Sequence, residues 1–167
     1  KNVRLVKVGD IGKPRQQVEA RRVWGGTLVQ ISDQFSGFDA DLKVAGQVEI
    51  PEGVEGDLRL AQTLAKHLKS NAVCLVKDRM LIGAGAGQMS RVDSANIAIE
   101  KAGERAQGSS AGSDAFFPFP DGPELLADAG VIAICQPGGS IKDDEVTAAC
   151  DAKGVCMVHT GIRHFRH

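Results

Sequence analysis

Long apolar runs are missing from this sequence. No stretch approaches the roughly 20 apolar residues that a membrane-spanning helix needs. The segment from Lys1 to Gly12 alternates charged and apolar residues and lacks the apolar centre of a signal peptide. We therefore expect a cytoplasmic protein without a membrane span. The chain begins at Lys1 rather than Met, so we also expect a segment upstream of it.

Neither sign of charge is in excess. The chain has 20 Lys and Arg against 21 Asp and Glu, for a formal net charge of −1. Proteins that bind nucleic acid without sequence preference normally carry a basic excess, so we exclude that class. A local anion pocket is not excluded, because such a pocket needs only a few well-placed donors.

The cysteines show no metal-binding spacing. Four are present, and none forms a C-x-x-C pair. Cys74 and Cys135 lie in apolar, strand-like runs, where a reduced cysteine behaves as a small buried hydrophobe. The sequence therefore predicts reduced thiols and no zinc site.

The apolar periodicity predicts an α/β domain. Leu58, Ala61, Leu64, Ala65 and Leu68 recur at helical spacing. Asp57 is the predicted cap of that helix. Residues 33–56 are predicted to form a surface segment, and the polar, Gly- and Ser-rich residues 104–112 a loop. The pattern predicts helices over 57–69, 90–103, 123–129 and 143–153, and strands over 1–8, 27–31, 72–76, 80–82, 131–135 and 155–159.

The alternation of helices and strands predicts a mixed sheet covered by helices. We divide the chain into residues 1–56, with N-terminal strands and a connecting segment, and residues 57–167, a compact α/β subdomain.

A glycine-rich run extends from Ile82 to Arg91. It does not match the dinucleotide fingerprint G-x-G-x-x-G, because Gln88 stands where the third glycine belongs, and no G-K-[ST] follows. Two interpretations remain open. The glycines either let the backbone approach a ligand, or let the end of a strand pack closely against the next helix.

Phenylalanine is concentrated in one short segment. The chain has six Phe and no Tyr, and three of the Phe lie between Ala115 and Asp121. Such rings can stack on a heterocycle or fill the core. Two interpretations are likewise open for the last five residues, R-H-F-R-H: a ligand-binding segment or an unstructured chain end. Arginines there can hold an anion, but spacing alone favours a frayed terminus.

Five strings in order resemble one family. They are K-S-N-A at 69–72, I-G-A-G-A-G-Q-M-S-R-V-D-S at 82–94, S-D-A-F-F-P-F at 113–119, Q-P-G-G-S at 136–140 and the terminal R-H-F-R-H. The chain resembles the bifunctional purine-biosynthesis family that joins AICAR formyltransferase to IMP cyclohydrolase. The similarity extends from Trp24 to the last residue, and indicates the C-terminal half of the formyltransferase region.

The resemblance implies a cytidine-deaminase-like three-layer α/β fold with a mixed sheet. It implies transfer of a formyl group from 10-formyltetrahydrofolate, the co-substrate, to AICAR, giving FAICAR. It also implies a homodimer with active sites at the subunit interface, or association with the missing N-terminal half. No metal is implied, because the H-x-E and P-C-x-x-C ligands of the zinc deaminases are absent.

The resemblance also assigns site residues. Asn71 is expected near the AICAR carboxamide and the reacting amine. The AICAR-binding set is Asn71, Arg91, Phe116 and Arg163, and the folate-binding set is Val92, Asp121, Ser140 and Ile141.

Two departures from the family pattern matter. The catalytic Lys-His pair of the family lies in a K-K-H-x-N-P-like string that this chain lacks, and Pro120 replaces an Arg. Lys66 and His67 are adjacent helix positions that do not share a face, so we treat them as surface residues. His159 and His167 are candidates for a substitute base. The cyclohydrolase region is absent from the resemblance.

Three hypotheses follow. The first is one chain of a formyltransferase whose other half is supplied elsewhere. The second is a binding module that kept the pocket and lost the base. The third, a dinucleotide-binding protein, depends on the glycine run alone, and Gln88 argues against it.

Overall fold

The computed structural model describes residues 3–9 and 17–166. Its contacts divide the chain into two compact units, Lys1–Gln34 and Phe35–His167. Among the described helices, none is long and apolar enough to cross a membrane.

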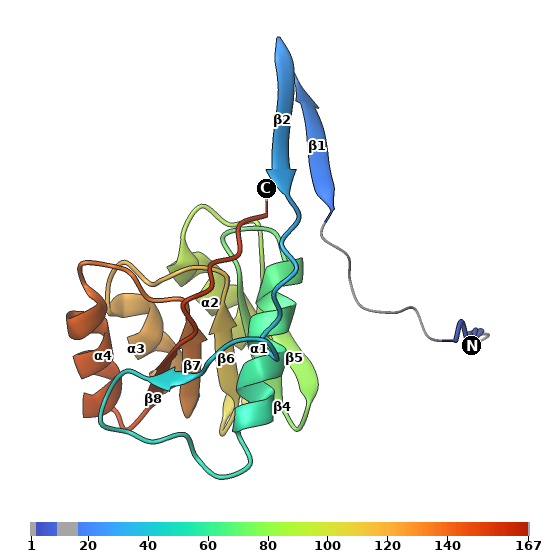
Figure 1. The fold of residues 1–167 in the computed structure, drawn as a ribbon. Coiled ribbons are helices and arrows are strands. Elements are labelled where there is room, and N and C mark those ends of the chain that lie inside the picture. The colour runs from blue at the N-terminus through green and yellow to red at the C-terminus, as the bar shows by residue number, and fades with distance from the viewer. Residues whose placement is uncertain (1–2, 10–16, 167) are drawn as a thin grey trace. The chain divides into compact units, whose positions relative to one another are not determined.

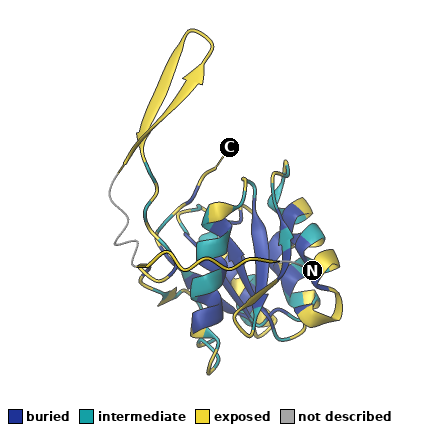
Figure 2. Cartoon of the chain, turned by 90° about the vertical axis from the view of Figure 1, so that its right-hand side faces the viewer, coloured by how far each residue is buried: buried dark blue, intermediate teal, exposed yellow. Residues whose placement is uncertain are grey.

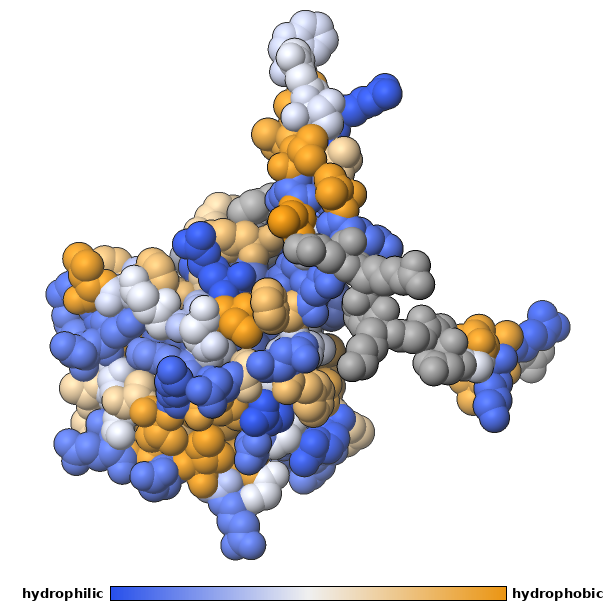
Figure 3. All heavy atoms as spheres, in the orientation of Figure 1, coloured by the Kyte–Doolittle hydropathy of each residue, from blue (hydrophilic) through white to orange (hydrophobic). Residues whose placement is uncertain are grey.

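The first unit contains a two-stranded antiparallel hairpin. β1 (Val18–Val23) pairs with β2 (Gly26–Ile31), and a two-residue turn at Trp24 and Gly25 joins them. Gly25 has a φ of 81°, which a tight turn of this kind requires. All residues of both strands are exposed, and apolar residues cluster along the hairpin (Figures 2 and 3). The strand predicted over residues 27–31 is confirmed within β2.

The strand predicted over residues 1–8 is wrong for the part described. Residues 3–9 form no strand, and Val3, Leu5, Val6 and Val8 are exposed. An alternating pattern forms a strand only where a neighbouring strand accepts and donates the backbone hydrogen bonds. Residues 1 and 2 lie outside the described residues.

The second unit is built on a six-stranded mixed sheet of order β3-β8-β7-β6-β4-β5 (Figure 1). β6, β7 and β8 are parallel to one another, whereas the pairs β4–β5, β4–β6 and β3–β8 are antiparallel. The strands are β3 (Lys43–Val44), β4 (Val73–Lys77), β5 (Met80–Gly85), β6 (Ser110–Ser113), β7 (Ala133–Gln136) and β8 (Cys156–His159).

Helices cover both faces of this sheet. On one face α1 (Glu55–His67) packs Leu58 and Ala61 with Cys74 and Cys135 of the sheet. The other face carries α2 (Arg91–Ala102), the short 3-10 helix η1 (Gly103–Ala106), α3 (Asp121–Asp128) and α4 (Asp143–Ala152). Successive strand residues alternate between the two cores, as strand geometry requires. The predicted three-layer α/β class with a mixed sheet is confirmed.

The predicted helices are all present, but Asp57 is not a cap. α1 begins at Glu55, and Val54 occupies its cap position without a side-chain hydrogen bond. The Asp57 carboxylate instead accepts hydrogen bonds from the backbone N–H groups of Asp78 (3.0 Å) and Arg79 (2.9 Å). These two residues form the turn between β4 and β5, both with positive φ. Asp57 therefore fixes this turn.

The loop predicted over residues 104–112 is wrong at its end. Residues 110–113 form β6, a central and fully buried strand of the sheet. Its sequence S-A-G-S has low β-propensity and shows no alternation, because both faces are covered. The small residues have a packing reason. A Cβ atom on Gly112 would lie 2.6 Å from the carbonyl carbon of Ala61, in the backbone of α1.

Residues 35–56 belong with the second unit rather than with the first 34 residues. Leu42, Val48, Ile50 and Val54 pack against the core beneath α1. The Asp151 carboxylate accepts hydrogen bonds from Gln47 N and Val48 N, which ties the segment to α4. The boundary between the two compact units thus falls after Gln34, whereas the sequence pattern predicted a boundary after residue 56.

The close approach of α1 to β6 makes Gly112 a sensitive position. We expect Gly112→Val to lower the free energy of unfolding by about 1–3 kcal/mol or more, because the new side chain displaces backbone rather than a flexible side chain. Urea unfolding followed by circular dichroism measures this. Gly26→Ala is the matched control, since nothing lies within 4 Å of its added Cβ. Equal stability of the two variants would contradict the packing argument.

The four cysteines are all buried and form no disulfide, and the predicted burial of Cys74 and Cys135 is confirmed. Burial raises the pKa of the Cys74 thiol to about 12, that of Cys150 to about 12 and that of Cys156 to about 11. Burial also raises the pKa of Cys135. Thiolates are the reactive form, so these groups are inert while the fold is intact.

The raised thiol pKa values predict a loss of stability at alkaline pH. Their ordinary value is 9.0, so between pH 9 and pH 11 the unfolded chain releases thiol protons that the folded chain retains. Each thiol then lowers the free energy of unfolding by about 1.4 kcal/mol per pH unit. Urea unfolding at pH 8 and at pH 10 measures the difference, and Cys74→Ala should reduce it. Equal stability at the two pH values would show that the thiols titrate alike in both states.

Candidate functional site

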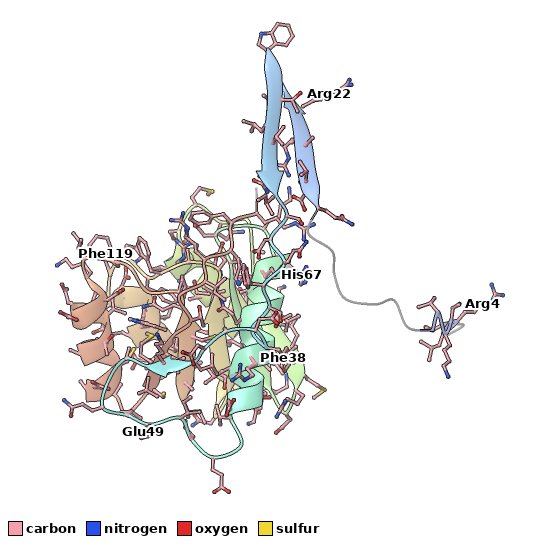
Figure 4. All side chains as sticks on the ribbon, in the orientation of Figure 1. Arg4, Arg22, Phe38, Glu49, His67 and Phe119 are labelled. Carbon is pink, nitrogen blue, oxygen red and sulfur yellow. The ribbon has the colours of Figure 1, made fainter. Side chains whose placement is uncertain are left out.

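Three of the predicted site residues, Asn71, Arg91 and Arg163, lie in segments that meet at one edge of the six-stranded sheet. The carboxyl ends of β6, β7 and β8 meet there. The antiparallel pairing places the first residues of β4 and the last residues of β5 at the same edge, since Val73 pairs with both Ser113 and Gly85. Figure 4 shows Phe119 and His67 at this edge, which we call the ligand edge.

Asn71 lies immediately before β4. Its side-chain Nδ2 donates to the carbonyl oxygens of Gln88 and Met89, each at 3.0 Å. Its own backbone carbonyl accepts a hydrogen bond from the Ser94 hydroxyl at 2.8 Å. Because both amide protons are used, the amide is fixed in orientation, and Oδ1 makes no hydrogen bond within the described chain. Oδ1 can therefore accept a hydrogen bond from an amine or amide.

Arg91 is the first residue of α2, and its guanidinium is held by a buried carboxylate. Its Nη2 donates to Asp114 Oδ1 at 3.1 Å, and the two side chains are only 12% and 1% exposed. Ser90 caps the helix, accepting a hydrogen bond from Asp93 N. The capped helix start and the ion pair together fix where this guanidinium lies.

Asp114 connects three segments of the ligand edge. Its Oδ1 also accepts from Ala72 N at 3.2 Å, next to Asn71. Its backbone carbonyl accepts from His164 N at 2.8 Å, next to Arg163. Asp114 stands within the string S-D-A-F-F-P-F and was not among the predicted site residues. The sequence feature that could have indicated its importance is its position between the small residues of 110–113 and the Phe-rich run.

The C-terminal tail is ordered against the ligand edge. Ser70 N donates to Arg166 O at 2.8 Å, and Arg166 N donates to the Ser70 hydroxyl at 3.0 Å. The Arg166 guanidinium donates to the carbonyl of His67, and His164 is buried. The frayed terminus that spacing alone favoured is therefore wrong for the tail through Arg166. Arg163 is exposed, with its guanidinium carbon 4.7 Å from the centre of the Phe165 ring.

The Phe run divides between core and surface. Phe117 is 1% exposed and fills the core, and a Cβ on Gly122 would lie 2.7 Å from its ring. Phe116 is half-buried and Phe119 is exposed. One ring of the three is thus a core plug, and the other two remain accessible to a ligand.

Gln136 orients His159. The buried Gln136 accepts a hydrogen bond from Phe117 N through Oε1, at 2.7 Å. Since a backbone N–H can only donate, the amide nitrogen of Gln136 faces His159 Nε2, 3.1 Å away. The Gln136 amide nitrogen is thus the donor toward His159 Nε2. Sequence reasoning missed Gln136, although it opens the quoted string Q-P-G-G-S.

The predicted folate-side residues are placed separately. Asp121 is exposed at the start of α3 and accepts from Gly122 N. Ser140 lies in the turn before α4, where Asp143 accepts from Gly139 N and Ser140 N, and Ile141 is fully exposed. Val92 is half-buried beside Arg91. Within the described residues no hydrogen bond or ion pair joins Asp121, Ser140 or Ile141 to Asn71 or Arg91.

The glycine run serves packing in its first part. Gly83 and Gly85 belong to β5, and a Cβ on either would lie about 2 Å from a carbonyl oxygen of α2. The interpretation of a strand end packed against a helix therefore holds for these two. Residues 86–90 connect β5 to α2, and Gly87 has a φ of 68° there. The Asn71 side chain bonds two carbonyl oxygens of this connection, those of Gln88 and Met89.

The remaining candidates fall outside this network. Lys66 donates to the carbonyl of Phe35, and His67 is exposed, as expected for surface residues. His167 lies outside the described residues. Among residues 3–9 and 17–166, no group of three His, Cys, Asp or Glu could hold a metal ion.

The fold and this edge define an α/β domain with fixed amide, guanidinium and aromatic groups around one end of a mixed sheet. A family model described as "AICARFT/IMPCHase bienzyme" matches residues 1–101. The chain belongs to this enzyme family, so the family predicted from the sequence strings is confirmed.

Similar proteins share this assignment. The chain is 49% identical over 166 residues to "Bifunctional purine biosynthesis protein PurH" of Rhodopirellula baltica, covering 99% of the chain and 32% of the relative. It is 48% identical over 167 residues to the protein of that name from Bacillus subtilis, covering 100% and 33%. The chain thus spans about a third of the length of these relatives.

Among solved structures, the dCMP deaminase from cyanophage S-TIM5 is similar, with a TM-score of 0.42 and 18% sequence identity. The similarity covers 65% of this chain and 98% of that one.

The docked tail predicts protected amides near the C-terminus. In hydrogen exchange on the 167-residue chain, the Ser70 and His164 amides should exchange at least about 10-fold more slowly than an exposed loop amide such as that of Ile141. Deleting residues 164–167 should release the Ser70 amide, whose acceptor is Arg166. Val76, in the centre of the sheet, serves as the control and should be unaffected. Fast exchange at both Ser70 and His164 would mean that the tail does not dock.

Proposed function

We propose that the chain supplies the second half of an AICAR formyltransferase unit, in the cytoplasm and in purine biosynthesis. The unit transfers a formyl group from 10-formyltetrahydrofolate to the 5-amino group of AICAR. The observation that supports this most directly is the convergence of Asn71, Arg91 and the Arg163 segment around Asp114. Three of the four AICAR-binding residues that the family resemblance implies thus share one buried anchor.

In the proposed reaction the amine nitrogen of AICAR attacks the formyl carbon. The bond from that carbon to N10 of the folate then breaks, N10 takes up a proton, and the amine gives one up. Asn71 Oδ1 is positioned to accept a hydrogen bond from the amine or the carboxamide, and so to orient the nitrogen lone pair. Arg91 and Arg163 supply positive charge for an anionic ligand, and Phe116 supplies a ring face.

The base for the amine proton is proposed to lie outside this chain. The K-K-H-x-N-P-like string of the family is absent from the 167 residues. The N-terminal half of the unit is proposed to supply it, either from the same polypeptide or from the second subunit of a homodimer of the longer protein. His159 is less suited to be a replacement, because Gln136 occupies its Nε2.

A second candidate function is a non-catalytic module that binds AICAR and folate. One observation favours it: Pro120 stands where the family has an Arg. The two functions share the ligand edge and differ only in whether the formyl group moves.

A chimera tests the proposal. This chain replaces the matching third of the Bacillus subtilis relative, and formyl transfer to AICAR is measured. We expect turnover, and we expect Arg163→Ala to raise the Michaelis constant for AICAR by about 10- to 100-fold, as for loss of a charged hydrogen bond worth about 1.5–3 kcal/mol. Arg79→Ala, at the opposite edge of the sheet, is the matched control.

Formation of IMP from FAICAR by the same chimera shows that the rest of the protein is folded. AICAR binding without formyl transfer would favour the binding module. No AICAR binding in a chimera that still forms IMP would refute both functions.

A further inference from the structure

We propose that Asp114 is a positioning residue for the AICAR site. It acts by holding the three segments that carry Asn71, Arg91 and Arg163 at fixed distances from one another. This inference rests on the proposed function for the identity of the ligand, but the network itself is a property of the chain.

Each attachment of Asp114 is at, or one residue from, a proposed ligand-binding residue. Oδ1 receives Ala72 N, which follows Asn71, and Arg91 Nη2 directly. The backbone carbonyl of Asp114 receives His164 N, which follows Arg163. The backbone N–H of Asp114 donates to Ala72 O at 3.3 Å, which doubles the link to the Asn71 segment.

The side chain of Asp114 is too deeply buried to touch a ligand itself. It is 1% exposed, whereas Arg91 is 12% exposed and reaches the surface. A buried carboxylate is costly unless it is paired, so a charge retained here needs a reason beyond stability. The structure supplies one, because the carboxylate is the only side chain in the described chain that bonds both the Asn71 segment and Arg91.

The pair also has an incomplete second arm. Arginine and a carboxylate commonly join through two parallel bonds, here Nη2 to one oxygen and Nε to the other. The first arm is made, while Arg91 Nε and Asp114 Oδ2 are both buried without a hydrogen-bond partner in the described residues. One bond, from Nη2 to Oδ1, therefore places the Arg91 guanidinium.

The test is a double-mutant cycle with Asp114→Asn and Arg91→Gln, made in the chimera described above. Asp114→Asn keeps the shape and one acceptor but removes the charge. We expect it to raise the dissociation constant for AICAR, measured by calorimetry, by about 10- to 100-fold. Because Asp114 acts through Arg91, it should have much less effect in the Arg91→Gln background. Equal effects in both backgrounds would overturn the proposal.

A matched control separates positioning from simple stability. Asp57 is also a poorly exposed carboxylate that accepts two backbone N–H groups and pairs with an arginine, but at the opposite edge of the sheet. Asp57→Asn should lower the unfolding temperature and leave AICAR affinity unchanged. If it weakens AICAR binding as much as Asp114→Asn does, the effect is a general loss of stability and the proposal is wrong.

A second measurement is independent of AICAR and of the proposed function. In the 167-residue chain, the Arg91 Nη2 protons, which donate to Asp114 Oδ1, should exchange slowly with water by nuclear magnetic resonance, and Asp114→Asn should accelerate the exchange. Slow exchange that depends on Asp114, together with no AICAR binding, would refute the proposed function and leave the network intact. AICAR binding with an Arg91 signal indifferent to Asp114 would refute the positioning role.

Should Asp114→Asn not fold, Asp114→Glu keeps the charge and displaces it by one methylene group. A folded Asp114→Glu protein is expected to bind AICAR more weakly, because the guanidinium is displaced with its partner. Affinity equal to that of the unaltered chimera would overturn the role.

Discussion

The pairing of β6 creates the edge on which the candidate site depends. β6 is antiparallel to β4 and parallel to β7, so the start of β4 and the ends of β6, β7 and β8 meet on one side. Asn71, Asp114 and Arg163 are distant in sequence and adjacent to this side for that reason alone. The central place of β6 in turn requires small residues, because α1 passes directly over Gly112. Packing of one helix thus determines where the polar groups converge.

Sequence reasoning recovered the elements that carry periodicity and missed those that do not. The helical spacing of Leu58, Ala61 and Ala65 predicted α1, but S-A-G-S has neither alternation nor bulky residues, and β6 read as a loop. The strings that resemble the family predicted Asn71, Arg91 and Arg163 as site residues. Asp114 and Gln136 could not be assigned, because their roles arise from backbone N–H groups that only the folded chain brings near them. Such partners leave no pattern along the sequence.

The order of the C-terminal tail also could not be predicted from the sequence. A five-residue basic terminus is ordinarily frayed, and nothing in its spacing says otherwise. It is held by reciprocal hydrogen bonds with Ser70 and by the carbonyl of Asp114. Ser70 precedes Asn71, so the tail and the Asn71 segment stabilise each other. The position of Arg163 therefore depends on contacts made on both sides of it rather than on the arginine itself.

Pro120 illustrates how a departure from the family pattern is accommodated. It occupies the cap position of α3 with a φ of −67°, the value that the proline ring imposes, and its carbonyl accepts from Glu124 N. The backbone therefore tolerates the change without strain. What is lost is electrostatic, since the neighbouring Asp121 is exposed and has Gly122 N as its hydrogen-bond donor rather than an arginine. The backbone of α3 thus accepts Pro120, and the change alters only the charge beside Asp121, on the proposed folate side.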